Sequence, residues 1–198
     1  MITYVLANVG RHALNRVRYY WGILCICILC CFISQHTYAQ QPSLDYQVKA
    51  AIVYKFLGYT NWPPHRFSNE HSPYRICVIG SNEITNELKN IVAHRKVEGR
   101  MIEIYSATTI EQIGDAHLVF VAKTMEPLLP SLVPVAKKLS YLVVSDNESG
   151  LIEGSAINLR VIDNRIGFDI SLPVTREYGL AVSSRLLSVA ATVKEVRN

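Results

Sequence analysis

The sequence lacks the short motifs that mark common catalytic sites. It has no GxSxG nucleophile elbow, no HExxH zinc motif, no GxxxxGK[ST] phosphate loop and no GxGxxG after the first predicted strand. Because each of these motifs holds reactive groups in a fixed geometry, their absence leaves no residue to which a reaction can be assigned. We therefore expect a protein that is not an enzyme and that needs no cofactor.

Cysteine is also scarce where a folded domain would use it. Four of the five cysteines lie in an apolar segment near the start of the chain, and only Cys77 belongs to the remainder. Cys77 sits within the apolar run 76–79, a setting typical of a small buried thiol. A single thiol cannot form an internal disulfide, so we expect none.

Histidines with metal-ligand spacing are missing as well. Beyond residue 40 the histidines are His65, His71, His94 and His117, and no cysteine or carboxylate completes a tetrahedral set with the loop pair His65 and His71. His94 is expected at a helix end, where a cation is favourable. His117 begins an apolar strand and is expected to be a hydrogen-bonded structural residue. No metal site is predicted.

Excess positive charge is confined to the first part of the chain. The sequence has 20 Lys and Arg against 16 Asp and Glu, but residues 1–39 contain three arginines and no acidic residue. A short apolar run, 19–33, follows these arginines, and Thr37-Tyr38-Ala39 offers a small-residue cleavage site. Because the run is shorter than a membrane-spanning helix requires, we expect a cleaved signal peptide over residues 1–39 and a periplasmic protein. The nearly neutral remainder carries no basic stripe for nucleic acid.

Residues 40–198 show apolar segments that alternate with helical patterns. A first helix is expected from Ser43 to the Trp62-Pro63-Pro64 stop, with five residues on one face: Val48, Ala51, Ile52, Lys55 and Tyr59. Strands are predicted over 75–79, 101–105, 117–121 and 141–145, with helices over 83–94 and 126–139. Short buried strands separated by helices favour a single α/β domain, a three-layer sandwich with a mostly parallel sheet.

The end of the chain predicts a β-hairpin followed by a final packed helix. Strands over 156–162 and 165–170 flank Asp163-Asn164, a pair that tolerates the positive φ of a tight turn. After Pro173, five apolar residues recur with helical spacing: Leu180, Leu186, Leu187, Ala190 and Val193. This helix is expected to lie on the sheet, and the hairpin to extend it.

Three groups of residues are candidates for binding a ligand or a partner. Asp146, Glu148 and Glu153 follow the fourth predicted strand, and the carboxyl ends of parallel strands are the usual ligand-binding rim. Aromatic residues gather near the end of the first helix, where Trp62 is equally suited to the core and to a partner interface. Exposed arginines that can form directed pairs with carboxylates are expected around the hairpin and the last helix: Arg160, Arg165, Arg176 and Arg185.

Two blocks of this sequence resemble the YfiR-like family of bacterial periplasmic regulators. The first is VKAAIVYKFLGYTNWP, residues 48–63, and the second contains Ile157-Asn158, the strand 165–170, Gly179-Leu180 and the SSRLL run 183–187. The resemblance implies that the chain binds the periplasmic sensor region of an inner-membrane diguanylate cyclase and represses it, so that release raises cyclic di-GMP and favours biofilm growth. It also implies a homodimer and an antagonist associated with the outer membrane.

The resemblance departs from the family at its cysteines. Relatives can carry a cysteine matching Cys77 and a partner near the position of Ala116-His117, whereas this sequence has no second cysteine there. Redox control is therefore not expected. Two other functions remain open from the residues: a periplasmic module that binds an aromatic or amino-acid-like ligand at the strand-end rim, and an uncharacterised hydrolase.

Overall fold

The computed structural model describes residues 41–196, so the predicted signal peptide lies outside the described residues. Within the compact unit that begins at Ser43, the sheet has seven strands in the order β3-β2-β4-β5-β6-β7-β9. The strands are β2 (Tyr74–Ile79), β3 (Ile102–Ala107), β4 (Leu118–Val121), β5 (Leu142–Ser145), β6 (Ile157–Ile162), β7 (Arg165–Ser171) and β9 (Thr192–Lys194). All neighbours are parallel except β6 and β7, which confirms the predicted α/β class with a mostly parallel sheet.

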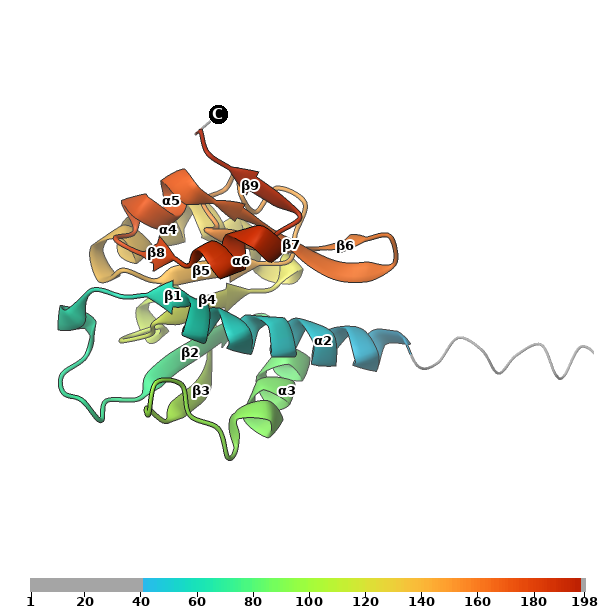
Figure 1. The fold of residues 1–198 in the computed structure, drawn as a ribbon. Coiled ribbons are helices and arrows are strands. Elements are labelled where there is room, and N and C mark those ends of the chain that lie inside the picture. The colour runs from blue at the N-terminus through green and yellow to red at the C-terminus, as the bar shows by residue number, and fades with distance from the viewer. Residues whose placement is uncertain (1–40, 197–198) are drawn as a thin grey trace, which may run out of the picture. The chain divides into compact units, whose positions relative to one another are not determined.

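The central strands are apolar on both faces because helices cover both sides of the sheet. Every residue of β4, LVFV, and of β5, LVVS, is buried. The helix α3 (Asn82–Val92) connects β2 to β3, and α4 (Leu129–Leu139) connects β4 to β5, in opposite directions along the sheet. Right-handed crossovers therefore place α3 and α4 on opposite faces (Figure 1).

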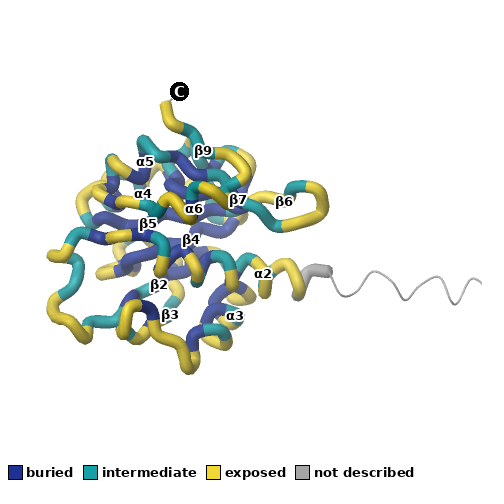
Figure 2. The backbone as a smooth tube through the Cα atoms, in the orientation of Figure 1, coloured by how far each residue is buried: buried dark blue, intermediate teal, exposed yellow. Residues whose placement is uncertain are grey.

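Three further helices complete the layers. The helix α2 (Gln41–Phe56) lies next to α6 (Ser184–Val189), and the ring of Phe56 meets Phe168 of β7 edge to face at 5.1 Å. On the other face α5 (Leu172–Glu177) is joined to α4 by the ion pair between Lys137 and Glu177. Short 3-10 turns connect these elements: η1 (Leu57–Tyr59), η2 (Pro64–Arg66), η3 (Ile110–Gln112) and η4 (Lys123–Leu128). Figure 2 shows buried backbone concentrated in the strands between the two helical layers.

The hairpin between β6 and β7 has the predicted turn. Asp163 and Asn164 adopt positive φ values of 47° and 60°, which match the right-handed twist of the two strands. Leu159 pairs with Phe168 across the hairpin, and both side chains are buried near its base. The tip is exposed and projects from the rest of the sheet (Figures 1 and 2).

The prediction of one continuous C-terminal helix is wrong. The segment forms α5, the short strand β8 (Ala181–Val182), α6 and the edge strand β9, which contains Val193. Gly179 breaks the helix with a φ of +73°, and the side chain of Ser183 caps α6 by accepting from the Leu186 amide. Pairing of β8 with β1 (Thr60–Asn61), and of β9 with β7, then satisfies backbone groups that a helix would have used.

The start of the first helix also differs from its prediction. The helix α2 begins at Gln41, two residues before the expected cap Ser43. Its buried side chains are those of Ala50, Val53 and Phe56. The five residues predicted to share a face do share one, which borders α6 and is partly exposed, with Ile52 and Tyr59 packed against the core.

Candidate functional site

A pocket opens at the carboxyl edge of the sheet, as expected for an open α/β fold. It has a volume of about 530 Å³, and its polar walls include Lys123, Asp146, Asn147, Arg160 and Lys194. Lys123 begins the turn after β4, Asp146 directly follows β5, and Arg160 comes from the hairpin. We call this the strand-end pocket.

Asp146 ties the strand-end pocket to its surroundings. Its Oδ1 accepts a hydrogen bond from the backbone N–H of Lys123 at 2.7 Å, and its Oδ2 pairs with Lys49 Nζ of α2 at 2.5 Å. The Asp146 side chain is only 10% exposed, so both contacts are partly shielded from water. Asp146 therefore joins two strand ends and α2 rather than offering a free carboxylate.

Small polar side chains form a hydrogen-bonded chain beneath the pocket. Ser155 Oγ donates to Ser145 Oγ at 2.7 Å, and Ser145 Oγ donates to Asn158 Oδ1 at 2.8 Å. Gly150 lies against this chain, because a Cβ built there would fall within 3.0 Å of side-chain oxygens from Ser145, Asn147 and Asn158. The absence of a side chain at Gly150 is what allows these oxygens to converge.

A second concave surface runs between α2 and α6. This α2–α6 groove has a volume of about 460 Å³ and is lined by Val48, Ala51, Ile52, Lys55, Phe56, Tyr59, Phe168, Leu186 and Val189. Val48 is 37% exposed and Val189 is 65% exposed, although both are apolar. An exposed apolar concavity of this kind is typical of a surface that binds another molecule.

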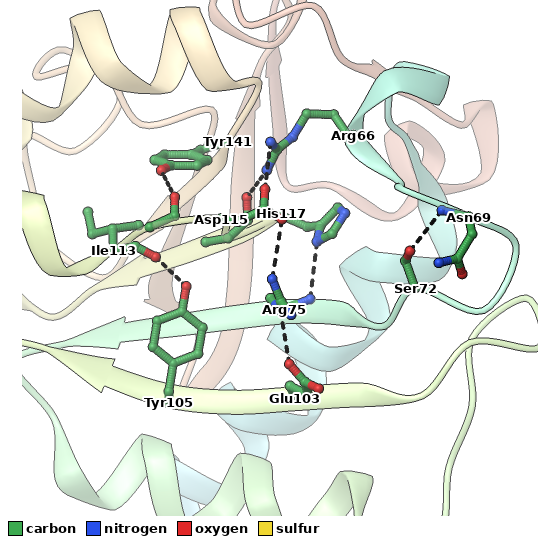
Figure 3. Close-up of polar contacts among 12 residues, drawn as sticks. Arg66, Asn69, Ser72, Arg75, Glu103, Tyr105, Ile113, Asp115, His117 and Tyr141 are labelled. Atoms are coloured by element: carbon green, nitrogen blue, oxygen red, sulfur yellow. Dashed lines mark hydrogen bonds and ion pairs between the residues drawn. The ribbon is translucent and has the colours of Figure 1, made fainter.

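At the opposite, amino edge of the sheet, charged side chains hold loop segments together (Figure 3). Arg66 Nη1 pairs with Asp115 Oδ1 at 2.8 Å, and its Nη2 donates to the carbonyl of Ala116. Arg75 pairs with Asp115 at 3.3 Å and with Glu103 of β3 at 2.9 Å. These contacts connect η2, β2, β3 and the residues before β4.

His117 lies in the centre of this amino-edge cluster and is 1% exposed. Its Nδ1 accepts from the Arg75 amide at 3.2 Å, and Phe67 stacks on the imidazole with ring centroids 4.6 Å apart. Burial, with a further contribution from the charge of Arg66, lowers the pKa of His117 to about 4. The imidazole is therefore neutral near pH 7, and the predicted structural role of His117 is confirmed.

Comparison with known proteins assigns the chain to a family. The model of the YfiR/HmsC-like family matches residues 46–191, most of the chain. This chain belongs to the YfiR/HmsC-like family. Members of this family are periplasmic regulators of diguanylate cyclase signalling rather than enzymes. A search of curated proteins finds no match.

Two solved structures resemble this YfiR/HmsC-like chain in fold. A conserved domain protein from Vibrio cholerae O1 biovar eltor strain N16961 matches with a TM-score of 0.52 at 10% identity. The match covers 75% of this chain and 60% of the other, so the chain spans less than two thirds of that protein. An ABC domain in complex with L-Trp from Streptococcus pneumonia matches with a TM-score of 0.46 at 10% identity, covering 61% and 55% of the two chains.

The candidate residues do not gather at one place in this YfiR/HmsC-like fold. Asp146, Glu148 and Arg160 line the strand-end pocket, whereas Glu153 is not among its lining residues. Trp62 is 8% exposed and donates from Nε1 to the His117 carbonyl at 3.2 Å, so its side chain is part of the core. The four arginines are exposed but belong to three separate elements, the hairpin, α5 and α6: Arg160, Arg165, Arg176 and Arg185.

Sequence reasoning missed three residues of the strand-end pocket. Lys123 follows the third strand along the chain, so the same strand-end rule that selected Asp146 points to it. Asn147 carries no local signal because it lies in a loop, and Lys194 enters the pocket from the edge strand β9, which the helical spacing of its neighbours does not predict.

The described residues contain neither a candidate metal site nor a candidate membrane-spanning helix. Among residues 41–196, no group of histidines, cysteines and carboxylates is arranged to hold a metal ion. No helix in that range has both the length and the apolar character that crossing a membrane requires. Cys77 is a free, fully buried thiol whose pKa is raised to about 12 by burial.

Proposed function

We propose that this chain represses an inner-membrane diguanylate cyclase by binding the cyclase's periplasmic sensor region through the α2–α6 groove. Membership of the YfiR/HmsC-like family supports the signalling role, and the exposed apolar lining of the groove supports the contact surface. The groove suits an amphipathic helix of the partner, whose apolar face would cover Val48 and Val189.

Repression by binding requires a difference in affinity between two states of the cyclase. A protein that bound the active and inactive sensor equally would shift nothing, however tightly it bound. The groove provides such a difference if the partner helix is accessible only in the inactive arrangement. Release of the repressor then raises cyclic di-GMP without this chain meeting the nucleotide.

The test measures cyclase activity in membranes. Inner-membrane vesicles from cells lacking this protein receive GTP on the cytoplasmic face of the membrane and the purified chain on its periplasmic face. We expect the wild-type chain to lower cyclic di-GMP production and Val189→Glu to fail, because a carboxylate in an apolar contact must lose its hydration. Val196→Glu is the matched control, since Val196 is 73% exposed and is not part of the groove.

Two outcomes would overturn the proposed function. One is a folded wild-type chain that leaves cyclase activity unchanged and recovers no cyclase from detergent-solubilised inner membrane. The other is equal repression by wild type and Val189→Glu. Among the arginines, Arg185 shares α6 with Leu186 and Val189, so Arg185→Ala is a second variant for the same assay.

The homodimer and the outer-membrane-associated antagonist belong to the same proposal. Light scattering of the purified chain measures its mass in solution, and a pull-down against outer-membrane proteins tests for the antagonist. A monomer at micromolar concentration would remove the dimer from the proposal.

A further inference from the structure

The strand-end pocket contains a buried side-chain amide that nothing in the described chain satisfies. Asn147 is 3% exposed, lines the pocket, and has no hydrogen-bond partner for either its Oδ1 or its Nδ2 among the described residues. Its polar neighbours Ser145, Ser155 and Asn158 bond to one another instead. Buried amides are normally paired, so Asn147 has the capacity to accept from and donate to a bound molecule.

Charges around the pocket divide into paired and unpaired groups. Asp146 is held by Lys49, and Arg160 forms a two-point contact with Asp169 at 2.6 and 3.2 Å. The remaining charged groups that line the pocket are the ammonium groups of Lys123 and Lys194 and the carboxylate of Glu148, and none of them has an ion pair within the described chain. A ligand that carries a carboxylate and an ammonium would complement both signs.

The pocket also has an apolar wall. Ile152 is 81% exposed and Val161 is 62% exposed, and both line the pocket together with Leu151 and Leu159. Exposed aliphatic side chains beside charged groups favour a ligand with an apolar body, because covering them removes apolar surface from water. The volume of about 530 Å³ falls within the range of small-molecule sites.

We propose that the strand-end pocket binds a small zwitterion with an apolar body, of the size of a dipeptide. Lys123 and Lys194 hold its carboxylate, Glu148 holds its ammonium, Asn147 bonds its polar backbone, and Ile152 and Val161 cover its side chains. This site is separate from the proposed partner surface, because the strand-end pocket and the α2–α6 groove share no lining residue. The test of ligand binding at the strand-end pocket is therefore independent of the test of cyclase repression.

Calorimetric titration of the purified full chain tests the ligand class. The probes are Leu-Leu, its C-terminal amide, which lacks the carboxylate, N-acetyl-Leu-Leu, which lacks the ammonium, and free L-leucine. We expect Leu-Leu to bind and each blocked dipeptide to bind at least tenfold more weakly, because a charged group of the pocket would lose its partner. Binding of L-leucine but not of Leu-Leu would support the same chemistry and assign the ligand to the single amino acids.

Variants then connect binding to the pocket. Lys123→Ala should weaken Leu-Leu binding about tenfold, as loss of a charged hydrogen bond does. The control Lys138→Ala removes an exposed lysine of α4 outside the pocket and should leave binding unchanged. Asn147→Asp, which keeps the side-chain shape but adds a negative charge, should weaken it further.

The proposal fails if neither Leu-Leu nor L-leucine binds at millimolar concentration to chain whose folding is confirmed by circular dichroism. It also fails if Lys123→Ala and Lys138→Ala bind the probe equally well, since binding would then occur elsewhere. Equal affinity for Leu-Leu and its two blocked forms would likewise contradict it, because the charges would contribute nothing.

Discussion

Replacing Gly150 by alanine should destabilise this YfiR/HmsC-like protein by about 2–4 kcal/mol. The new Cβ would lie 2.5 Å from Asn147 Oδ1 and 2.6 Å from Asn158 Oδ1, and closer still to Ser145 Oγ. Overpacking of a filled interior costs roughly 1–3 kcal/mol. Displacing the buried Ser145 to Asn158 hydrogen bond adds about 1 kcal/mol, which together gives the expected range.

Urea unfolding followed by circular dichroism measures this change, with Gly58→Ala as the control. A Cβ at Gly58 would have Val97 Cγ1 at 3.9 Å as its nearest neighbour, which is ordinary van der Waals contact. We expect Gly58→Ala to lie within about 1 kcal/mol of wild type or above it, because alanine restricts the unfolded chain. A Gly150→Ala free energy of unfolding within about 0.5 kcal/mol of wild type would show that the space around Gly150 is not tightly filled.

Three further predictions concern the buried side chains. The pKa of His117 is lowered to about 4 in the folded chain, so the stability contributed by its neutral imidazole is complete above about pH 6.5 and is lost as the pH falls toward 4. Between pH 7 and pH 4, the free energy of unfolding in urea should fall by about 2–3 kcal/mol more in wild type than in His117→Asn. Parallel pH profiles of the two proteins would contradict this prediction. Cys77 is buried and its pKa is raised to about 12, so in the folded chain at pH 8 it should react with iodoacetamide on the order of 100-fold more slowly than in the chain unfolded by urea. Mass spectrometry of the peptide that contains Cys77 measures both rates, and equal rates would disprove its burial. Trp62→Phe removes the Nε1 bond to the His117 carbonyl and should lower the free energy of unfolding by about 1 kcal/mol, whereas an unchanged value would exclude a contribution from that bond.

The sheet could be predicted because its signals are local. Strands such as β4 and β5 are short, largely apolar and bounded by helical patterns, and the turn at Asp163-Asn164 depends on the conformational preferences of two adjacent residues. The helix predicted over 180–193 failed for the opposite reason. Its apolar spacing fits a helix, but pairing of β9 with β7 and of β8 with β1 depends on distant segments.

The candidate site residues likewise divide into those that a local pattern predicts and those that depend on distant segments. Asp146 could be placed at the sheet edge because topology puts the carboxyl ends of parallel strands at one rim. Its ion pair with Lys49, 97 residues earlier, could not be predicted, because no local pattern relates α2 to the loop after β5. Trp62 was undecided from the sequence, since only the surrounding contacts with Tyr74 and His117 show that its ring is enclosed.

The α/β class, the strands and the hairpin turn are encoded locally, because periodicity and turn chemistry act over a few residues. Two motif blocks also carried the resemblance to the YfiR-like family. The exposed face of α2 and the unpaired charges of the strand-end pocket arise only in the folded chain. Both depend on side chains far apart in the chain, whose desolvation and pairing are settled only when the sheet brings them together.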